Sequence, residues 1–553
     1  MGKMERKKIY ILAMTVLLLI QLGGLLYFGN KKAGFHEDEL YTYYSSNKTA
    51  GLFVSDRQWL ERDGLRNDFV VLPGEGFRYD VVWQMQSWDV HPPLYYFVFH
   101  TVCSLFPEVF SKWLGISVNL LFYAGSYVLL VYCAYTAALC GAGEKAEQEK
   151  RAESLSFLTC LFWGFSAAVI SGVMFIRMYQ QLTFFVLLCL ALHLRAVRKQ
   201  DFRIRCFLLP LAVTVFLGFL TQYYYIIFHF FLGAGFCIYL FYKMPGKKKI
   251  KGLVSYASAC AIGLGTALLY YPPALSHIFR GYRGTEAVSE FGDASNTMDR
   301  LRFFGGLFDD YVMNGTLSIW LLVLAVLAVT AGYLKKRGKR FSGGKNQGRG
   351  TNPAILLMLS AAAGYFFIVS KTALLLGETS NRYQLPVYGI WCFLLLYAAW
   401  HLMEELAGEK LGDSFKKVLT GICCAVVLLT SLTALGQGKV FFLYEEEKEI
   451  MEFVKAHKDV PVVVFYHENS GDHIWWLSDE LMEYPRVYLA SMGNEELIAD
   501  ETITQSDSLL VYMADHEDSG KFLQDLLAVN GNLSSCQEIA EKGRGVWKLY
   551  EVR

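Results

Sequence analysis

Long apolar runs separated by short polar segments make up most of this 553-residue chain. Most of the runs hold about 18 or more residues without a charge, the length that an α-helix needs to cross roughly 30 Å of hydrocarbon. We therefore predict a polytopic α-helical membrane protein with eleven spans, at residues 9–29, 114–140, 155–175, 179–195, 206–221, 223–242, 252–271, 313–334, 353–370, 384–403 and 417–437.

One further apolar stretch, at residues 91–107, does not fit this set of spans. Its uncharged part is only about 15 residues long, which is short for a span. Counting it as a span would also put the N-terminus and the basic loop 195–205 on opposite sides of the membrane. His100 and Ser104 fall on one side at helical spacing. We therefore predict an amphipathic helix over 93–106 that lies flat in the outer interface.

The distribution of lysine and arginine predicts how the chain is oriented. Short loops rich in these residues stay in the cytoplasm, and here they are 195–205, 243–251 and 335–350, together with the N-terminal MGKMERKK. The first apolar run is read as an uncleaved span because no small-residue cleavage site follows it. The N-terminus is thus expected inside, and the segments expected outside are the loops 30–113 and 272–312 and the tail 438–553.

The tail differs in character from the rest of the chain. Runs rich in β-branched and aromatic residues predict strands at 460–468, 484–491, 508–515 and 545–552, and a helix is predicted at 519–531. Strands that alternate with helices indicate a small extracytoplasmic α/β domain with a largely parallel sheet. The predicted organisation is a transmembrane domain at 1–437 followed by this domain at 438–553.

Composition narrows the class of protein further. The chain is 54% hydrophobic and 15% aromatic, and its net charge of +1 gives no bulk case for nucleic-acid binding. Most of the twelve cysteines lie inside apolar runs, and only Cys536 lies in the tail. A framework of secreted disulfides is therefore not expected.

Three acids, Glu37, Asp38 and Glu39, follow the first span directly. Neighbouring side chains on a helix point about 100° apart, so Asp38 and Glu39 cannot both aim at one atom. One could act as a base while the other accepts structural hydrogen bonds. The alternative is a solvated first helical turn, where acids interact favourably with the helix dipole.

A second polar group, Asp89 and His91, lies just before two prolines that suit the first turn of a helix. The plain alternative is a turn that returns the loop to the membrane surface. Together with His36 and Asp38, these residues could also ligate a divalent metal, although their spacing matches no known metal motif.

Two arginines, Arg177 and Arg382, begin membrane helices on the predicted outer side, where positive charge is disfavoured. They could snorkel to headgroups, or they could grip a lipid-linked phosphate with their planar guanidinium groups. Lys371 is a weaker candidate of the same kind. Arg280 and Arg283 are expected in a solvated loop.

Four strings connect these observations to a known family. The strings FHEDELYTYY, WDVHPPLYYF, FIRMYQQLTF and SNRYQLPVYGIW occur in this order. Over roughly residues 1–435 the chain resembles the GT-C fold membrane glycosyltransferases. Within them it is similar to the bacterial family-39-like group, which is related to protein O-mannosyltransferases and to the aminoarabinose transferases of lipid A. One departure is that Phe175 and Ile176 precede Arg177, where the family usually has an E-A pair.

The resemblance implies an enzyme that moves a sugar from a polyprenyl-phosphate donor to an acceptor hydroxyl on the outer face of a bacterial plasma membrane. It implies Asp38 as the base and Asp89 as the second loop acid, and we add Glu39 as an alternative orienting carboxylate. We expect direct displacement with inversion, no required cofactor, and a glycan, lipid or protein acceptor. The residues expected to bind substrate are His91, Arg177, Tyr179, Lys371, Arg382 and Tyr383.

Two other classes of protein were weighed against this interpretation. A lipid or solute transporter or flippase would be expected to show broken midspan helices, ions within the membrane and an internal repeat, and none is visible in the sequence. A membrane-anchored binding protein whose tail is the functional part would not need arginines at the outer ends of several spans.

Overall fold

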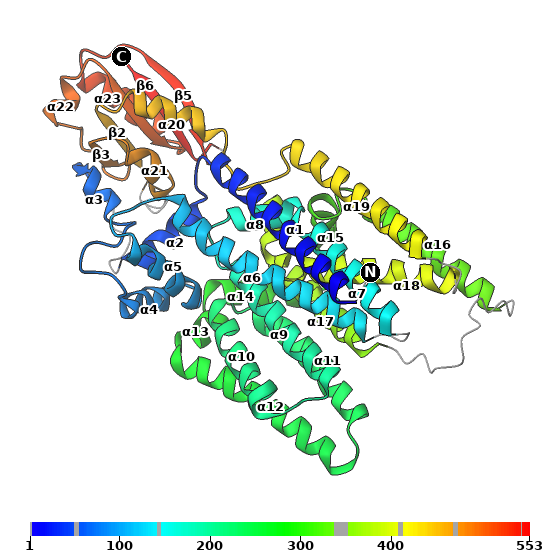
Figure 1. Ribbon diagram of the computed structural model, residues 1–553. Coiled ribbons are helices and arrows are strands. Elements are labelled where there is room, and N and C mark those ends of the chain that lie inside the picture. The colour runs from blue at the N-terminus through cyan, green and yellow to red at the C-terminus, as the bar shows by residue number, and fades with distance from the viewer. Residues whose placement is uncertain are drawn as a thin grey trace.

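The computed structural model describes residues 3–48, 55–140, 145–336, 352–407, 413–467, 474–543 and 545–553. A body of long helices carries a sheet domain at one end, and the N-terminus lies at the end of α1 far from that domain (Figure 1). The long helices of the body are α1 (Lys3–Lys31), α6 (Lys112–Leu139), α9 (Tyr179–Lys199), α11 (Tyr225–Lys243), α12 (Gly246–Tyr270), α16 (Leu317–Lys336), α17 (Pro353–Thr372), α18 (Asn381–Ala407) and α19 (Asp413–Gly436).

The spans predicted from the sequence correspond to helices in the structure. Within the described residues, nine helices are long and apolar enough to cross a membrane, one of them formed by η1 (Ile204–Leu208) with α10 (Leu209–Thr221). A bent pair of helices makes a tenth, and the apolar part of α19 is a shorter segment, Thr420–Gly436. The prediction of a polytopic helical membrane protein is therefore confirmed.

The span predicted over 155–175 is broken into two helices. α7 (Lys145–Gly164) and α8 (Ala167–Met174) meet at an angle of 59°. At the break, the side chain of Gln21 lies so close to Gly164 that a Cβ atom there would be 2.3 Å from it, and the Ser166 hydroxyl donates to the carbonyl of Trp163. The bend directs α8 toward the connection 175–178, which enters the cavity described below.

Shorter helices gather near the sheet end of the body. The connection between α1 and α6 contains α2 (Glu37–Asn47), α3 (Arg62–Arg66), α4 (Tyr79–Trp88) and α5 (Leu94–Leu105). α5 is the helix predicted at 93–106, but its residue His100 is buried: Nδ1 donates to Asn47 Oδ1 at 3.1 Å and Nε2 accepts from the backbone N–H of Arg78. A second group of short helices comprises α13 (Pro273–Phe279), α14 (Tyr282–Gly292), α15 (Thr297–Tyr311) and η2 (Gly377–Ser380).

The sheet domain has six strands in the order β1-β3-β2-β4-β6-β5. β2 pairs in parallel with β3 and β4, whereas the other three pairings are antiparallel, so the sheet is mixed and not largely parallel as predicted. Its strands are β1 (Gln58–Glu61), β2 (Val462–Tyr466), β3 (Arg486–Ser491), β4 (Leu509–Ala514), β5 (Cys536–Lys542) and β6 (Trp547–Val552), and its helices are α20 (Glu447–Ala456), α21 (Ser478–Leu481), α22 (Glu501–Thr504) and α23 (Ser519–Val529).

Strand β1 comes from the loop that follows the first span, although the rest of the sheet comes from the tail. It pairs with β3 in a register that places Trp59 opposite Tyr488, and their rings meet edge to face at 5.4 Å. Arg62, just after β1, donates its backbone N–H to the carbonyl of Pro485. The loop that carries the three predicted acids is therefore attached to the tail domain.

Candidate active site

The first turn of α2 sets the directions of the three acids. His36 caps the helix: its Nδ1 accepts from the backbone N–H of Asp38 at 3.0 Å, while the carboxylate of Glu39 accepts from the backbone N–H of His36 at 2.7 Å. This reciprocal arrangement is a capping box. Burial lowers the pKa of His36 to about 4, which keeps its ring neutral and able to accept. Asp38 and Glu39 consequently face different surroundings.

Glu39 forms a buried ion pair beneath this turn. Its carboxylate lies 2.8 Å from Lys32 Nζ, both side chains are fully buried, and it also accepts from the backbone N–H of Ile176 at 2.8 Å. Lys32 donates in addition to the carbonyl of Phe442 at 2.7 Å. Glu39 does not line the cavity. The structure therefore places Glu39 in a buried ion pair outside the cavity, where it accepts structural hydrogen bonds and does not face a substrate.

Asp38 faces the opposite way and pairs with Arg382 at the start of α18. Asp38 Oδ2 lies 3.0 Å from Arg382 Nη1; the Asp38 side chain is 34% exposed and that of Arg382 is 5% exposed. The guanidinium also lies over the rings of Phe175 and Tyr383, each with its centroid 5.1 Å away. Such cation–π contacts fix the plane of an arginine.

Arg177 joins this pair to the second predicted acid. Its Nη1 donates to the backbone carbonyl of Asp38 at 3.2 Å and to the Tyr96 hydroxyl at 3.0 Å, and its Nη2 lies 3.3 Å from His91 Nε2. His91 Nδ1 in turn lies 2.9 Å from Asp89 Oδ2. These residues form a continuous polar network that runs from Asp89 to Asp38.

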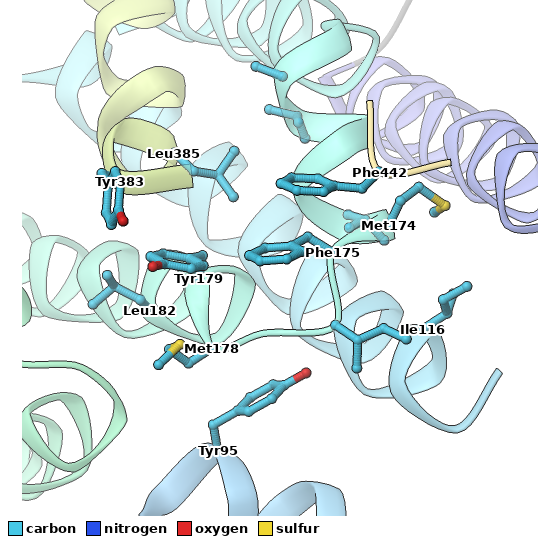
Figure 2. Close-up of a cluster of buried hydrophobic side chains, with 14 of the residues drawn as sticks. Tyr95, Ile116, Met174, Phe175, Met178, Tyr179, Leu182, Tyr383, Leu385 and Phe442 are labelled. Carbon is cyan, nitrogen blue, oxygen red and sulfur yellow. The ribbon is translucent and has the colours of Figure 1, made fainter. Parts of the chain in front are cut away.

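Stacked aromatic rings hold the connection that carries Arg177. The ring of Phe175 stacks on Phe442 at 4.0 Å and on Tyr179 at 6.1 Å, and Tyr179 meets Tyr383 edge to face. Figure 2 shows the rings of Phe442, Phe175 and Tyr179 side by side. Phe175 occupies the position where the resembling family usually has an acid, and here it supports Arg382 through its ring.

A cavity of about 1040 Å³ opens next to the network. Seven of the nine site residues named from the sequence line it: Asp38, Asp89, His91, Arg177, Tyr179, Arg382 and Tyr383. Sequence reasoning missed Trp475 and His277, and it placed Arg283 in a solvated loop although Arg283 also lines this cavity. No local pattern marked Trp475, whereas the position of Arg283 within the predicted outer loop 272–312 was a usable signal.

Lys371 does not take part in the cavity. Its Nζ donates to the backbone carbonyl of Asp293 at 2.5 Å, to Thr297 Oγ1 at 3.1 Å and to the Asn296 side chain, and it is buried. Asp293 and Asn296 lie in the segment that joins α14 to α15, and Thr297 is the first residue of α15. Lys371 therefore anchors that segment and does not line the cavity, where the sequence had led us to expect it.

Two of the carboxyl groups that line the cavity, those of Asp38 and Asp89, have lowered pKa values. Burial alone would raise the pKa of Asp38, but the positive charges of Arg177 and Arg382 outweigh it and hold that pKa below its ordinary value. Burial would also raise the pKa of Asp89, but interactions, chiefly those with the neighbouring His91, outweigh this effect and lower that pKa. Both groups are therefore negative at neutral pH. Among the described residues, no three His, Cys, Asp or Glu side chains converge closely enough to hold a metal ion.

Comparison with known proteins identifies the class of fold. No family model matches the chain, and no curated protein matches it in sequence. Among solved structures, ArnT from Cupriavidus metallidurans bound to undecaprenyl phosphate aligns with a TM-score of 0.50 at 11% identity, over 100% of this chain and 98% of that one. The apo state of the same protein aligns with a TM-score of 0.45 at 12% identity, over 96% and 98%.

The fold is thus that of a GT-C membrane protein, as predicted from the sequence motifs. The particular protein to which it is similar, ArnT, is an aminoarabinose transferase. At this level of identity the likeness concerns the arrangement of helices and the attached sheet domain.

The buried Lys32–Glu39 pair generates a test of how the turn is held. Lys32→Met should lower the free energy of unfolding by about 3–5 kcal/mol, because it leaves a carboxylate buried without its counter-ion. Thermal unfolding of the purified protein measures the loss. The double variant Lys32→Met/Glu39→Gln removes both charges and should recover part of the stability. A double variant that is no more stable than Lys32→Met would contradict this account.

Proposed function

We propose that this protein is a membrane glycosyltransferase that moves a sugar from a polyprenyl-phosphate donor to an acceptor hydroxyl. The observation that carries the proposal is the meeting of Asp38 with Arg177 and Arg382 in one cavity. The cavity continues onto an apolar wall that includes Ile227 and Ile368. The carboxylate can take the proton of an acceptor hydroxyl, the two arginines can bind a phosphate, and the apolar wall can contact a lipid chain. The undecaprenyl phosphate bound by the similar ArnT supports this assignment.

The proposed reaction is a direct displacement at the anomeric carbon with inversion. A lipid phosphate is already a good leaving group, so the step needs a base for the acceptor hydroxyl and positive charge for the departing phosphate, and it needs no cofactor. Asp38 serves as the base. Arg177 and Arg382 stabilise the charge that develops on the leaving oxygen. Asp89 acts through His91, which contacts Arg177 and helps to orient it.

The Asp38–Arg382 pair suggests how donor binding prepares the base. A carboxylate whose pKa is far below the working pH accepts a proton poorly. A donor phosphate that binds Arg382 competes with Asp38 for the same guanidinium. Once that positive charge is shared with the phosphate, burial raises the pKa of Asp38 and makes it a stronger base.

We further propose that the N-terminus is cytoplasmic and that the cavity and the sheet domain face the outside of a plasma membrane. The sheet domain and the N-terminus lie at opposite ends of α1 (Figure 1). The basic segments 195–205 and 243–251 follow helices whose other ends lie near the cavity. This placement obeys the positive-inside rule. The acceptor, whether glycan, lipid or protein, would reach the cavity from outside.

Replacement of the proposed base tests the reaction. Asp38→Asn should lower turnover by about 10²–10⁴-fold, the usual contribution of a general base. The measurement is consumption of a panel of undecaprenyl-phosphate sugars by purified protein. Asp80→Asn is a matched control, because Asp80 is an exposed carboxylate on α4 that pairs with Arg78 outside the cavity. Full turnover by Asp38→Asn would reject the assignment, and retention of the donor's anomeric configuration would reject inversion.

Removal of Arg382 tests the electrostatic link through pH. In the native protein Asp38 has a lowered pKa, so it stays ionised until the pH falls below its ordinary value of about 3.9. In Arg382→Gln the positive charge that lowers the pKa of Asp38 is removed, so burial raises that pKa. The acid limb of kcat/KM that belongs to Asp38 should therefore move to higher pH, in addition to a loss of rate. Arg302→Gln, which changes an exposed arginine on α15, should leave the profile in place. An unchanged profile in Arg382→Gln would contradict the link.

Cys536 is a native cysteine that allows a test of the side of the membrane on which the sheet domain lies. It is exposed on β5, whereas the other described cysteines are buried or partly buried in the helical body. A membrane-impermeant maleimide should label intact cells at this residue, and Cys536→Ser should abolish the labelling. Labelling that requires permeabilised cells would place the sheet domain on the cytoplasmic side and reject the orientation.

A further inference from the structure

The cavity has two ends that differ in chemistry, with the Asp38–Arg382 pair between them. Ring contacts show which residues lie at each end of the cavity. Trp475 contacts Tyr44 on one side, while on the other side Arg382 contacts Tyr383 and Tyr383 contacts Tyr224. On the side of Tyr224 the lining includes the apolar side chains Ile226, Ile227, Ile278, Ile368 and Leu374, with the polar residues Arg283 and Glu286 of α14 beside them. That end suits the lipid chain of a donor. The other end contacts neither the lipid chain nor the phosphate of the proposed donor.

The end beyond Asp38 is an aromatic wall built on α2. Tyr41 and Ser45 follow Asp38 at intervals of three and four residues, which place them on the same helix face. With a rise of about 1.5 Å per residue, the wall extends roughly 10 Å from Asp38 along α2. Beyond Asp38 its described lining residues are Tyr41, Tyr44, Ser45, Met85, Trp88 and Trp475, and none of these six carries a charge. Glu37, which also lines the cavity, lies next to Asp38 in the first turn of α2.

Trp475 brings the sheet domain into this wall. It lies just before α21, and its ring is 4.0 Å from that of Tyr44, 5.5 Å from Tyr41 and 5.6 Å from Phe69. The side chain is largely buried, yet it lines the cavity. A residue of the sheet domain thus forms a surface of the same cavity that contains Asp38.

An uncharged wall of aromatic rings and hydroxyl groups favours one kind of acceptor. A phosphate or an acidic peptide needs cations to offset its desolvation, and the cavity's arginines lie in the central network or at the α14 side. A sugar ring presents an apolar face of C–H groups and an edge of hydroxyls. Tyrosine and tryptophan match both parts, because each combines an apolar ring with a polar tip.

We infer that the wall formed by Tyr41, Tyr44 and Trp475 is the acceptor subsite and that it binds a neutral saccharide; this inference rests on the proposed function. One hydroxyl of the bound saccharide faces Asp38. Its oxygen forms the new bond to the donor's anomeric carbon as the bond from that carbon to the phosphate oxygen breaks. The proton passes to Asp38, and the bonding electrons leave with the polyprenyl phosphate.

The experiment uses the full chain in nanodiscs and measures ligand binding by calorimetry. The probes are maltose, lactose and chitobiose as neutral disaccharides, with glycerol 3-phosphate and a serine-containing acidic peptide as alternatives. We expect saturable binding of at least one disaccharide and weaker binding of the other two classes. Trp475→Leu should raise the disaccharide Kd about tenfold, the order expected for loss of one aromatic contact. Trp475→Phe, which keeps a ring, should recover most of the affinity.

Two further variants separate a local effect from a loss of folding. Tyr41→Leu changes a partly exposed ring of the same wall and should weaken disaccharide binding even where Trp475→Leu proves unstable. Trp59→Leu is the matched control, because Trp59 lies on β1 of the same sheet domain but does not line the cavity. It should leave the disaccharide Kd unchanged.

The outcomes also distinguish this inference from the function on which it rests. Donor consumption that requires Asp38, together with no disaccharide binding, would overturn the acceptor subsite and leave the transferase standing. Tighter binding of glycerol 3-phosphate or of the peptide would overturn the neutral saccharide in the same way. A disaccharide Kd that is the same in the native protein, in Tyr41→Leu and in Trp475→Leu would overturn the assignment of the aromatic wall as the acceptor subsite. Absence of donor consumption in the native protein would refute the transferase itself.

Discussion

The ion pair between Lys32 and Glu39 is the interaction on which the site depends. Two opposite charges withdrawn from water are tolerated only when their hydrogen bonds are satisfied. Here Glu39 meets Lys32 and the backbone of His36 and Ile176, while Lys32 also meets the carbonyl of Phe442. The pair therefore joins the end of the first span, the first turn of α2, the α8–α9 connection and the segment that leads into the tail.

Around the Lys32–Glu39 pair, two kinds of contact hold the site: charged contacts and stacked aromatic rings. Charged contacts determine which groups face the cavity, since Asp38, Arg177 and Arg382 are held by one another and by His91. Stacked rings support those groups, because Phe175 packs between Phe442 and Tyr179 (Figure 2). The guanidinium of Arg382 lies over the ring of Phe175. These contacts aim the polar groups at the cavity in advance, which is the arrangement that electrostatic stabilisation without reorganisation requires.

The sequence predicted features that depend on local composition and failed where distant segments decide. Apolar length identified the helices of the body, but it gave no sign of the bend between α7 and α8, which lies where the distant Gln21 packs against Gly164. The predicted topology put Glu39 and Lys371 on the same side as Asp38, yet only their contacts show that neither lines the cavity. The approach of Asp38 to Arg382 was expected from the shared predicted placement of the acids and arginines at one membrane face and from the family resemblance, and not from any local pattern. β1 and Trp475 had no local signal, because their partners lie hundreds of residues away.

Because one strand of the sheet comes from the first loop and the others come from the tail, the sheet can be completed only late in the protein's synthesis. Glu61 ends β1 and Arg486 begins its partner β3, so 486 − 61 = 425 residues separate them. At roughly 5–20 residues per second, a ribosome needs on the order of 20–85 s to make that interval. The loop that bears the acids is made early, and its strand β1 cannot pair until β3 has been made. Completion of the cavity is therefore coupled to the end of translation, and a nascent chain halted before the tail would lack a finished centre.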